Sequence, residues 1–335
     1  MNENNTSKTT EEKLAKAEAK AAKKLAKAQA AENGSDEKVK KPKVKRVAVD
    51  ELAQMARSDI RLSGLTMGAM EARYLVDAYY ISQNGRIRSD AQVRSMEGEP
   101  TAVIQYLAGV AAITENTIKK TLDDYTLHHP VGAWLRTIVG IGPVTAAGLI
   151  AHLDVKKSET AGGFWKFAGL AGDKWEKGQK RPWNAELKKL VCFKVGESFV
   201  KTQNKEEGFY GKLYRERKDH ETAKNEAGGF ADIAAQILAQ KKWDKSTPTY
   251  ACMVQGKLSP AHIHARARRY AVKIFLSHLH EVMYLTEFGK PPPAPFAIAI
   301  LNHAHRIHIP NPGSVKEWKE HVEITDDDFK DDIDN

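Results

Sequence analysis

The stretch LRTIVGIGPVTAAGLI, from Leu135 to Ile150, constrains the fold more than any other part of the sequence. It has an apolar segment, a tight turn at 140–142 and a second apolar segment that begins at Pro143. Glycine tolerates a positive φ, and proline is favoured at the first position of a helix. The stretch therefore predicts two short helices joined by a tight turn. The candidate phosphate contacts at this turn are Gly140, Ile141, Gly142 and Thr145.

The segment GIGPVTA at 140–146 matches the helix-hairpin-helix pattern, because both glycines, the apolar residue between them and the small residues after them are present. Backbone N–H groups at the start of a helix attract phosphate. Such a hairpin contacts the nucleic-acid backbone and implies no sequence specificity. The alternative is a plain helical turn that packs against a neighbouring element.

Basic residues and tryptophans alternate downstream of this hairpin. Lysine and arginine neutralise phosphates, and exposed aromatic rings stack on unpaired bases. We expect Trp165 and Phe167 to lie in the core, and we regard Trp175 and Trp183 as candidates for stacking. The candidate phosphate contacts are Lys174, Lys177, Lys180 and Arg181 on a loop, with Lys188 and Lys189 on the next helix.

A long basic helix is expected at 260–288. At about 100° per residue, a stripe of cations and histidines forms opposite an apolar face. The segment 257–280 contains no Asp or Glu, which favours a phosphate-binding face over a merely solvated one. The predicted stripe consists of His262, Arg266, Arg269, Lys273 and His280, and the candidate contacts here are Lys257, His262, Arg266, Arg269 and Lys273.

The charge of the chain points to a polyanionic partner. The 335 residues include 52 Lys and Arg against 43 Asp and Glu, a net charge of +9. Segment 1–46 has 13 basic and 7 acidic residues, whereas 316–335 has 3 basic and 9 acidic. A basic body between oppositely charged ends favours nucleic acid, although a solvated surface with solubilising tails is the alternative.

Composition also excludes several classes of protein. The two cysteines exclude a disulfide scaffold and a cysteine-ligated zinc ribbon. No apolar run reaches the roughly 20 residues of a membrane helix, and no apolar signal segment begins the sequence. We therefore expect a cytoplasmic protein with no membrane partner.

The sequence predicts an all-α protein in four segments. Residues 1–46 form a disordered basic tail, 47–127 a helical or coiled-coil arm, 128–310 a compact body and 311–335 an acidic tail. The motifs Asn84-Gly85 and Glu99-Pro100 are expected to interrupt the arm. Within the body, helices are expected at 131–152, 163–171, 184–200, 229–241, 260–288 and 295–307.

Catalytic and metal-binding signatures are weak. Histidine pairs two residues apart diverge on a helix, and no cysteine or acid completes a site beside His305 and His308. There is no Walker loop and no set of carboxylates that suggests a metal-dependent nuclease. We expect no cofactor, no metal and no enzymatic activity, and we nominate no catalytic residue.

With these motifs in view, residues 130–308 resemble the C-terminal domain of the bridge-RNA-guided insertion-sequence transposases. The matching segments, in order, are HPVGAWLRTIVGIGPVTAAGLIAHL, FWKFAGLAG, FYGKLYRERK and AHIHARARRYAVKIFLSHLHEVMYLTEFGKPP. Two departures matter. The N-terminal carboxylate nuclease domain of that family is replaced by a helical arm, and no serine occurs from Ala171 to Val195, where that family has its nucleophile.

A helical arm followed by such a domain is similar to the Nop-domain architecture of box C/D RNA–protein particles. It is more similar still to the nuclease-free Tas proteins of the TIGR-Tas family, which occur in prokaryotes and their viruses. This resemblance implies a kinked, box C/D-like guide RNA that pairs with target DNA. It also implies RNA contacts at Lys257, Arg266, Arg269 and Lys273. The alternatives are a guide-free helix-hairpin-helix accessory factor that binds DNA, or a transposase-like enzyme with a rebuilt active site.

The arm also predicts an association surface. Tyr74, Leu75, Ala78 and Tyr79 form one apolar stripe, and Val103, Ile104 and Leu107 form another. Stripes of this kind pair with a second copy or with a partner. We therefore expect a homodimer through residues 47–127, as the Nop-like resemblance also implies.

Overall fold

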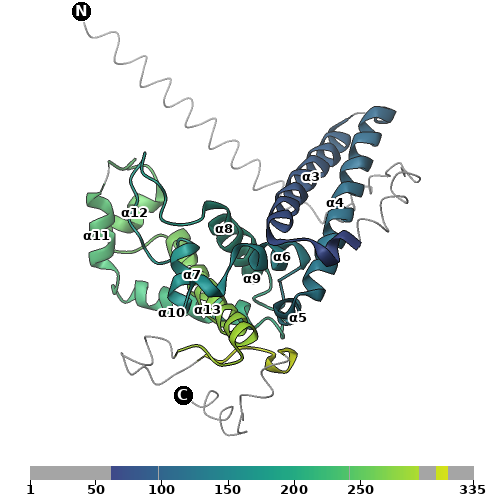
Figure 1. Cartoon of the computed structure of the whole chain (residues 1–335). Coiled ribbons are helices and arrows are strands. Elements are labelled where there is room, and N and C mark those ends of the chain that lie inside the picture. Colours follow the sequence, from purple (N-terminus) through teal and green to yellow (C-terminus); the bar gives the residue numbers. More distant parts are fainter. Residues whose placement is uncertain (1–61, 97, 241, 294–306, 316–335) are drawn as a thin grey trace, which may run out of the picture. The chain divides into compact units, whose positions relative to one another are not determined.

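The computed structural model describes residues 62–96, 98–240, 242–293 and 307–315 (Figure 1). The predicted tails at 1–46 and 316–335 and nearly all of the predicted helix at 295–307 lie outside these ranges. Helices account for 71% of the described residues, in eleven α-helices numbered α3 to α13, and those residues contain no strand. The all-α prediction is confirmed.

Two antiparallel helices form the arm, α3 (Ala69–Ser95) and α4 (Ala102–His128), and they lie side by side in Figure 1. The expected break at Glu99-Pro100 is confirmed, because the chain turns there. The expected break at Asn84-Gly85 is wrong, because α3 continues through it. Packing of α3 against α4 on both sides of that dipeptide outweighs the low helix propensity of glycine.

A buried polar network holds α3 against α4. Glu115 is only 8% exposed and accepts hydrogen bonds from Arg86 Nε at 2.5 Å and Gln83 Nε2 at 3.3 Å. Arg86 also pairs with Asp90 at 3.3 Å. Burial alone would raise the pKa of Glu115, but the hydrogen bonds from Arg86 and Gln83 lower it below its ordinary value.

The base of the arm shares an apolar cluster with the body. Val76 of α3 and Leu122 of α4 are buried against Val144 and Ala147 of α6 (Pro143–His152). The side chains of Leu75 and Tyr79 pack against the same cluster, so they belong to this interface rather than to a free stripe. Removing the arm would therefore uncover α6.

The predicted hairpin is present as α5 (Pro130–Thr137) and α6, with the turn at 138–142 between them. Gly140 has φ +99°, a conformation that favours glycine. Ile141 is 5% exposed and anchors the turn in the core. The hydroxyl of Ser198 donates to the carbonyl of Gly140 at 2.6 Å, so one side of the turn also packs against α9 (Gly196–Lys201).

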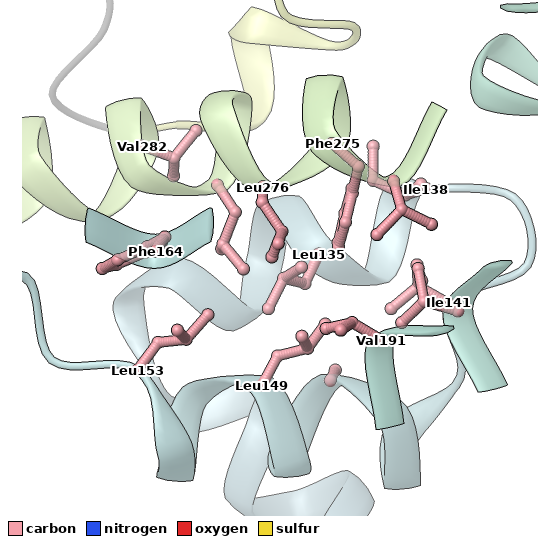
Figure 2. Packing of buried hydrophobic residues seen from close by; sticks show 14 of the residues in the cluster. Leu135, Ile138, Ile141, Leu149, Leu153, Phe164, Val191, Phe275, Leu276 and Val282 are labelled. Carbon is pink, nitrogen blue, oxygen red and sulfur yellow. The ribbon is translucent and has the colours of Figure 1, made fainter. Parts of the chain in front are cut away.

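The main core forms where α13 (Pro260–Phe288) passes the hairpin. Figure 2 shows Phe275 and Leu276 of α13 facing Leu135 and Leu149 of the hairpin helices. Phe164 of α7 (Ala161–Phe167) and Val191 fill the space beside them. The bounds predicted for the long helix, 260–288, are confirmed.

The remaining helices modify the sequence prediction. The helix predicted at 184–200 is a continuous run of α8 (Ala185–Lys189), the π-helix η2 (Leu190–Val195) and α9. Helix α11 (Ala231–Ala239) lies inside its predicted range, whereas α7 ends four residues before its own. Two helices were not predicted, α10 (Phe209–Glu226) and α12 (Pro248–Val254). Short 3-10 turns complete the fold, η1 (Val155–Lys157) and η3 (Pro312–Ser314).

Candidate nucleic-acid interface

A groove of about 1090 Å³ gathers cations and aromatic rings from separate parts of the chain. Its walls come from the loop between α7 and α8, from α8 and η2, from the α11–α12 region and from the first half of α13. Among the described residues that line it there is no Asp or Glu. The groove therefore combines positive charge with ring surface. The side chains that supply them are Trp175, Arg181, Trp183, Lys188, Lys189, Phe193, Trp243, His262, Arg268 and Arg269.

Trp175 and Trp183 form the aromatic wall that the sequence suggested. Their ring centroids lie 6.3 Å apart with the planes at 65°. The guanidinium of Arg181 lies 5.0 Å from the centroid of Trp175, and the ammonium of Lys188 lies 4.0 Å from that of Trp183. Each ring therefore has a cation beside it, which places phosphate-binding charge next to a stacking surface.

Local backbone contacts hold Trp183 in place. Asn184 caps α8 by accepting the N–H of Leu187 at 2.9 Å, and its own N–H donates to the carbonyl of Phe167 at 2.9 Å. Gly169 has φ +66°, and a Cβ there would lie 2.8 Å from Cγ of Trp183. The indole can approach the backbone at this point because the residue is glycine.

Sequence reasoning missed the part of the groove that comes from the α11–α12 region. The indole N–H of Trp243 donates to the carbonyl of Ile237 at 3.2 Å, which ties this tryptophan to α11. Helices α11 and α12 enclose a small apolar cluster of their own, with Phe230 and Met253 among its buried residues. The signal was present, since Trp243 follows two lysines in the same way that Trp183 follows basic residues.

The predicted stripe on α13 is only partly present. His262 and Arg269 line the groove, and Arg268, which was not among the candidates, lines it as well but is paired with Glu197. His280 is a correction, because it is 1% exposed and its Nε2 lies 2.9 Å from the carbonyl of Ser158. A helical wheel does not show how many sides of a helix are covered. The C-terminal half of α13 contacts α10 through His278 as well as the segment after η1 through His280.

Three other candidates on this region interact within the protein. Arg266 Nε donates to Glu221 Oε2 at 2.7 Å, and Lys257 pairs with Glu226. Lys273 lies 4.2 Å from the ring centroid of Trp165, and burial followed by the nearby charge of Arg269 lowers its pKa. Arg269 is the exposed cation of the predicted stripe. The three phosphate contacts expected of Arg266, Arg269 and Lys273 therefore reduce to one unpaired cation in the groove.

The three candidate lysines before Arg181 do not line the groove. Lys174, Lys177 and Lys180 are exposed on the segment that carries Trp175. Lys189 lines the groove and lies 3.7 Å from Glu186. Trp165 is half-buried against the main core, as expected, but the core prediction for Phe167 is wrong, because that ring is 42% exposed.

Lysines on neighbouring elements lie near the helix that follows the hairpin turn. Gly142 caps α6, and a Cβ there would meet no atom within 4 Å, so the start of the helix is open on that side. Thr145 hydrogen-bonds with Tyr80, whose pKa burial raises to about 12. The ammonium of Lys194 lies 3.9 Å from the ring centroid of Tyr80, and its pKa is lowered by burial and then by Lys189 and Lys201.

The described residues contain no group of three or more His, Cys, Asp or Glu side chains able to hold a metal ion. No helix within the described part of the chain is long and apolar enough to cross a membrane. No protein-family model matches the chain, and neither a curated protein nor a solved structure matches it. Functional assignment therefore depends on the groove and the hairpin themselves.

Proposed function

We propose that this protein binds RNA through the tryptophan-lined groove. The observation that carries the proposal is the composition of the groove wall, where three tryptophans lie among arginines and lysines and no described lining residue is a carboxylate. Rings stack on bases of any identity, and cations follow the phosphate backbone. Unpaired nucleotides offer both features at once, whereas the bases of a duplex are already stacked.

The bound RNA acts, in this proposal, as a guide that pairs with target DNA. Base pairing then supplies sequence specificity, and the protein supplies shape and phosphate contacts. The support is the resemblance of the ordered motifs to RNA-guided proteins, together with a groove of rings and cations, which bind bases of any identity and phosphates. We assign no cleavage step to any residue, and the absence of nuclease activity stays a prediction.

A guide-free DNA-binding protein is the second candidate, and the hairpin favours it. The start of α6 is open beside Gly142, and Lys189, Lys194 and Lys201 lie on the elements next to the hairpin. A protein of this kind contacts duplex backbone without reading bases. The two candidates differ in whether RNA is an obligatory component of the particle.

The function is tested by the nucleic acid that accompanies the purified full-length chain. We expect RNA to copurify. Treatment with RNase, but not with DNase, followed by removal of the fragments should then lower the ratio of absorbance at 260 nm to that at 280 nm to the value of protein alone. Copurification of duplex DNA alone, with no binding of single-stranded RNA at physiological salt, would falsify the RNA proposal and favour the guide-free candidate.

The same binding assay has a matched pair of variants on α13. Arg269→Ala is expected to reduce the log–log dependence of RNA affinity on salt by about 0.7 to 1 unit, because one phosphate contact is lost. Arg266→Ala is expected to leave that slope unchanged, since Arg266 is already paired with Glu221. An equal effect of both variants would place the RNA elsewhere on α13.

We also propose a homodimer that forms through the arm. Val103 and Leu107 of α4 are 61% and 55% exposed, whereas Leu75 and Tyr79 of the other predicted stripe already pack against the body. One turn of α4 therefore provides the apolar surface that a second copy could cover.

Light scattering of the full-length chain is expected to give twice the 37.2 kDa mass of the monomer. Val103→Glu combined with Leu107→Glu should yield the monomer, because like charges would face each other across the twofold axis. Val254→Glu, at a side chain 59% exposed on α12, is the control. A monomeric wild-type chain, with and without RNA, contradicts this prediction.

A further inference from the structure

A second cavity of about 1000 Å³ lies outside the groove described above. It is lined by the start of α3, the α4–α5 junction, the segment from α6 to η1, α7 and the end of α13. None of its lining residues was a candidate from the sequence, and neither the RNA proposal nor the hairpin uses it. Its volume is at the upper end of the roughly 300–1,000 Å³ typical of small-molecule sites.

The walls of this cavity offer a flat apolar surface. Phe164 is buried at 2% exposure, and Val131 and Met283 lie among the lining residues with it. Phe167 lines the same cavity but is 42% exposed, together with Pro182 from the loop before α8. An exposed phenylalanine on a cavity wall provides the stacking surface that a planar heterocycle needs.

The charge of the lining is positive overall. Its two carboxylates are already paired, Asp154 with Lys157 at 3.0 Å and Glu287 with Lys156 at 2.6 Å. Within the described residues, no carboxylate pairs with the two remaining cations, Arg73 and Lys166. Arg73 uses its Nε to donate to the carbonyl of Ala151 at 2.7 Å, so its terminal N–H groups remain available.

A histidine adds a neutral hydrogen-bond donor. Nδ1 of His129 accepts the N–H of Val131 at 3.3 Å, and burial lowers the pKa of this ring. The neutral ring therefore has its proton on Nε2, which can donate to a ligand. His129 lines the cavity together with the cations and Phe167.

We propose that this cavity is a nucleotide-binding site, in which Phe167 and Pro182 contact the base while Lys166 and Arg73 bind the phosphate. An anionic group explains the surplus of two cations, and a planar ring explains the exposed aromatic wall. A purely apolar ligand would leave the cations without a partner, and inorganic phosphate alone would leave the ring surface uncovered.

The nucleotide has two possible sources, a free mononucleotide or the phosphorylated end of an RNA strand. The second source is suggested by the loop that separates the two cavities. Arg181 and Trp183 line the groove, whereas Pro182 between them lines this cavity. A strand in the groove could therefore place its terminal nucleotide on the other side of the same loop. The cavity itself does not depend on the RNA proposal.

The test uses the full-length chain freed of nucleic acid and titrated calorimetrically with AMP, adenosine and inorganic phosphate. We expect one AMP per chain, with adenosine and phosphate each at least about tenfold weaker. Phe167→Ala is expected to weaken AMP about tenfold, and Lys166→Gln to weaken AMP but not adenosine. Both side chains are exposed on the short helix α7, and Tyr106→Ala on the arm is the control.

A second titration separates the two sources. Single-stranded RNA with a 5′-phosphate is compared with the same strand bearing a 5′-hydroxyl. If AMP does not bind but the phosphorylated strand binds more tightly than the 5′-hydroxyl strand, loss of that difference in affinity in Phe167→Ala and Lys166→Gln supports the strand end as the ligand. If neither AMP nor the 5′-phosphate is recognised, or if both variants bind like the wild type, the nucleotide site is wrong. Binding of the 5′-hydroxyl strand depends on the groove alone. Failure of the nucleotide-site proposal therefore does not contradict the RNA proposal.

Discussion

Replacing both Trp175 and Trp183 by alanine is expected to weaken the binding of single-stranded RNA by about 100-fold. Stacking of one base on an aromatic ring contributes about 1–3 kcal/mol, and about 1.4 kcal/mol corresponds to a tenfold change in affinity. The two rings also orient Arg181 and Lys188, which lie over them at 5.0 and 4.0 Å. Fluorescence anisotropy of a labelled strand at fixed salt measures the loss.

The controls for this prediction distinguish stacking from folding. The double variant should keep its thermal unfolding within a few degrees of the wild type, because neither ring is part of the main apolar cluster. Tyr106→Ala removes a ring that is 51% exposed on the arm and should leave RNA affinity unchanged. Wild-type affinity in the folded double variant would remove the groove as the RNA site.

Trp243→Ala provides an independent check on the groove. This ring lines the same groove from a different part of the chain. If one strand occupies the groove, its loss should also weaken RNA binding, by up to about tenfold for a single stacked base. If the Trp175 and Trp183 double variant weakens RNA binding but Trp243→Ala does not, the RNA contacts only the loop between α7 and α8.

The substitution Glu221→Ala is expected to lower the free energy of unfolding by about 3–5 kcal/mol. Glu221 is 1% exposed and accepts hydrogen bonds from Arg266 Nε at 2.7 Å and Arg217 Nε at 2.8 Å. Removing the carboxylate leaves two guanidinium groups without their counter-charge between α10 and α13. Urea denaturation followed by circular dichroism measures the change.

A compensated variant makes this prediction sharper. Replacing Glu221 by Leu together with Arg217 and Arg266 by Met should recover most of the lost stability, because no charge is then left without a partner. A loss below about 1 kcal/mol in Glu221→Ala would show that the network contributes no more than an exposed ion pair. A compensated variant as unstable as Glu221→Ala would attribute the loss to packing instead.

The same network predicts a pH dependence. Burial alone would raise the pKa of Glu221, but hydrogen bonds from Arg266 and Arg217 and their charges lower it below the ordinary value. Because the folded-state pKa is lowered, the contribution of ionised Glu221 to the free energy of unfolding is fully present above the ordinary pKa of about 4.3. This contribution is lost as the pH falls through the folded-state pKa. The stability difference between the wild type and the compensated variant should therefore shrink in acid.

Much of the fold could be predicted from local patterns. The turn between the hairpin helices follows from two glycines and a proline, and the 29 residues of α13 follow from helical spacing that begins at Pro260. Helix α10 was missed because its apolar residues are few, and its buried face includes Glu221 and Asn225. Asn225 is satisfied by Leu258, and Glu221 pairs with the distant Arg266 as well as with Arg217 one turn before it on α10.

The groove was half predicted. Arg181, Lys188 and Lys189 lie in one segment with the pair Trp175 and Trp183, so a local pattern identified them. Trp243 belongs to the same groove, yet it is 60 residues further along the chain than Trp183. No periodicity connects positions so far apart, because their proximity depends on how α11 and α12 pack beside α13.

By itself, the sequence determined the helical fold, the hairpin turn at 140–142 and the identity of most cationic and aromatic groups, because these depend on spacing, turn chemistry and composition. Only the tertiary structure decided which cations are available. Arg266 and Arg269 are three residues apart on one helix, but a buried carboxylate from α10 neutralises the first while the second lines the groove. Ion pairs between helices join residues that are distant in sequence, because the partner of a side chain depends on which helix surfaces meet in the folded chain.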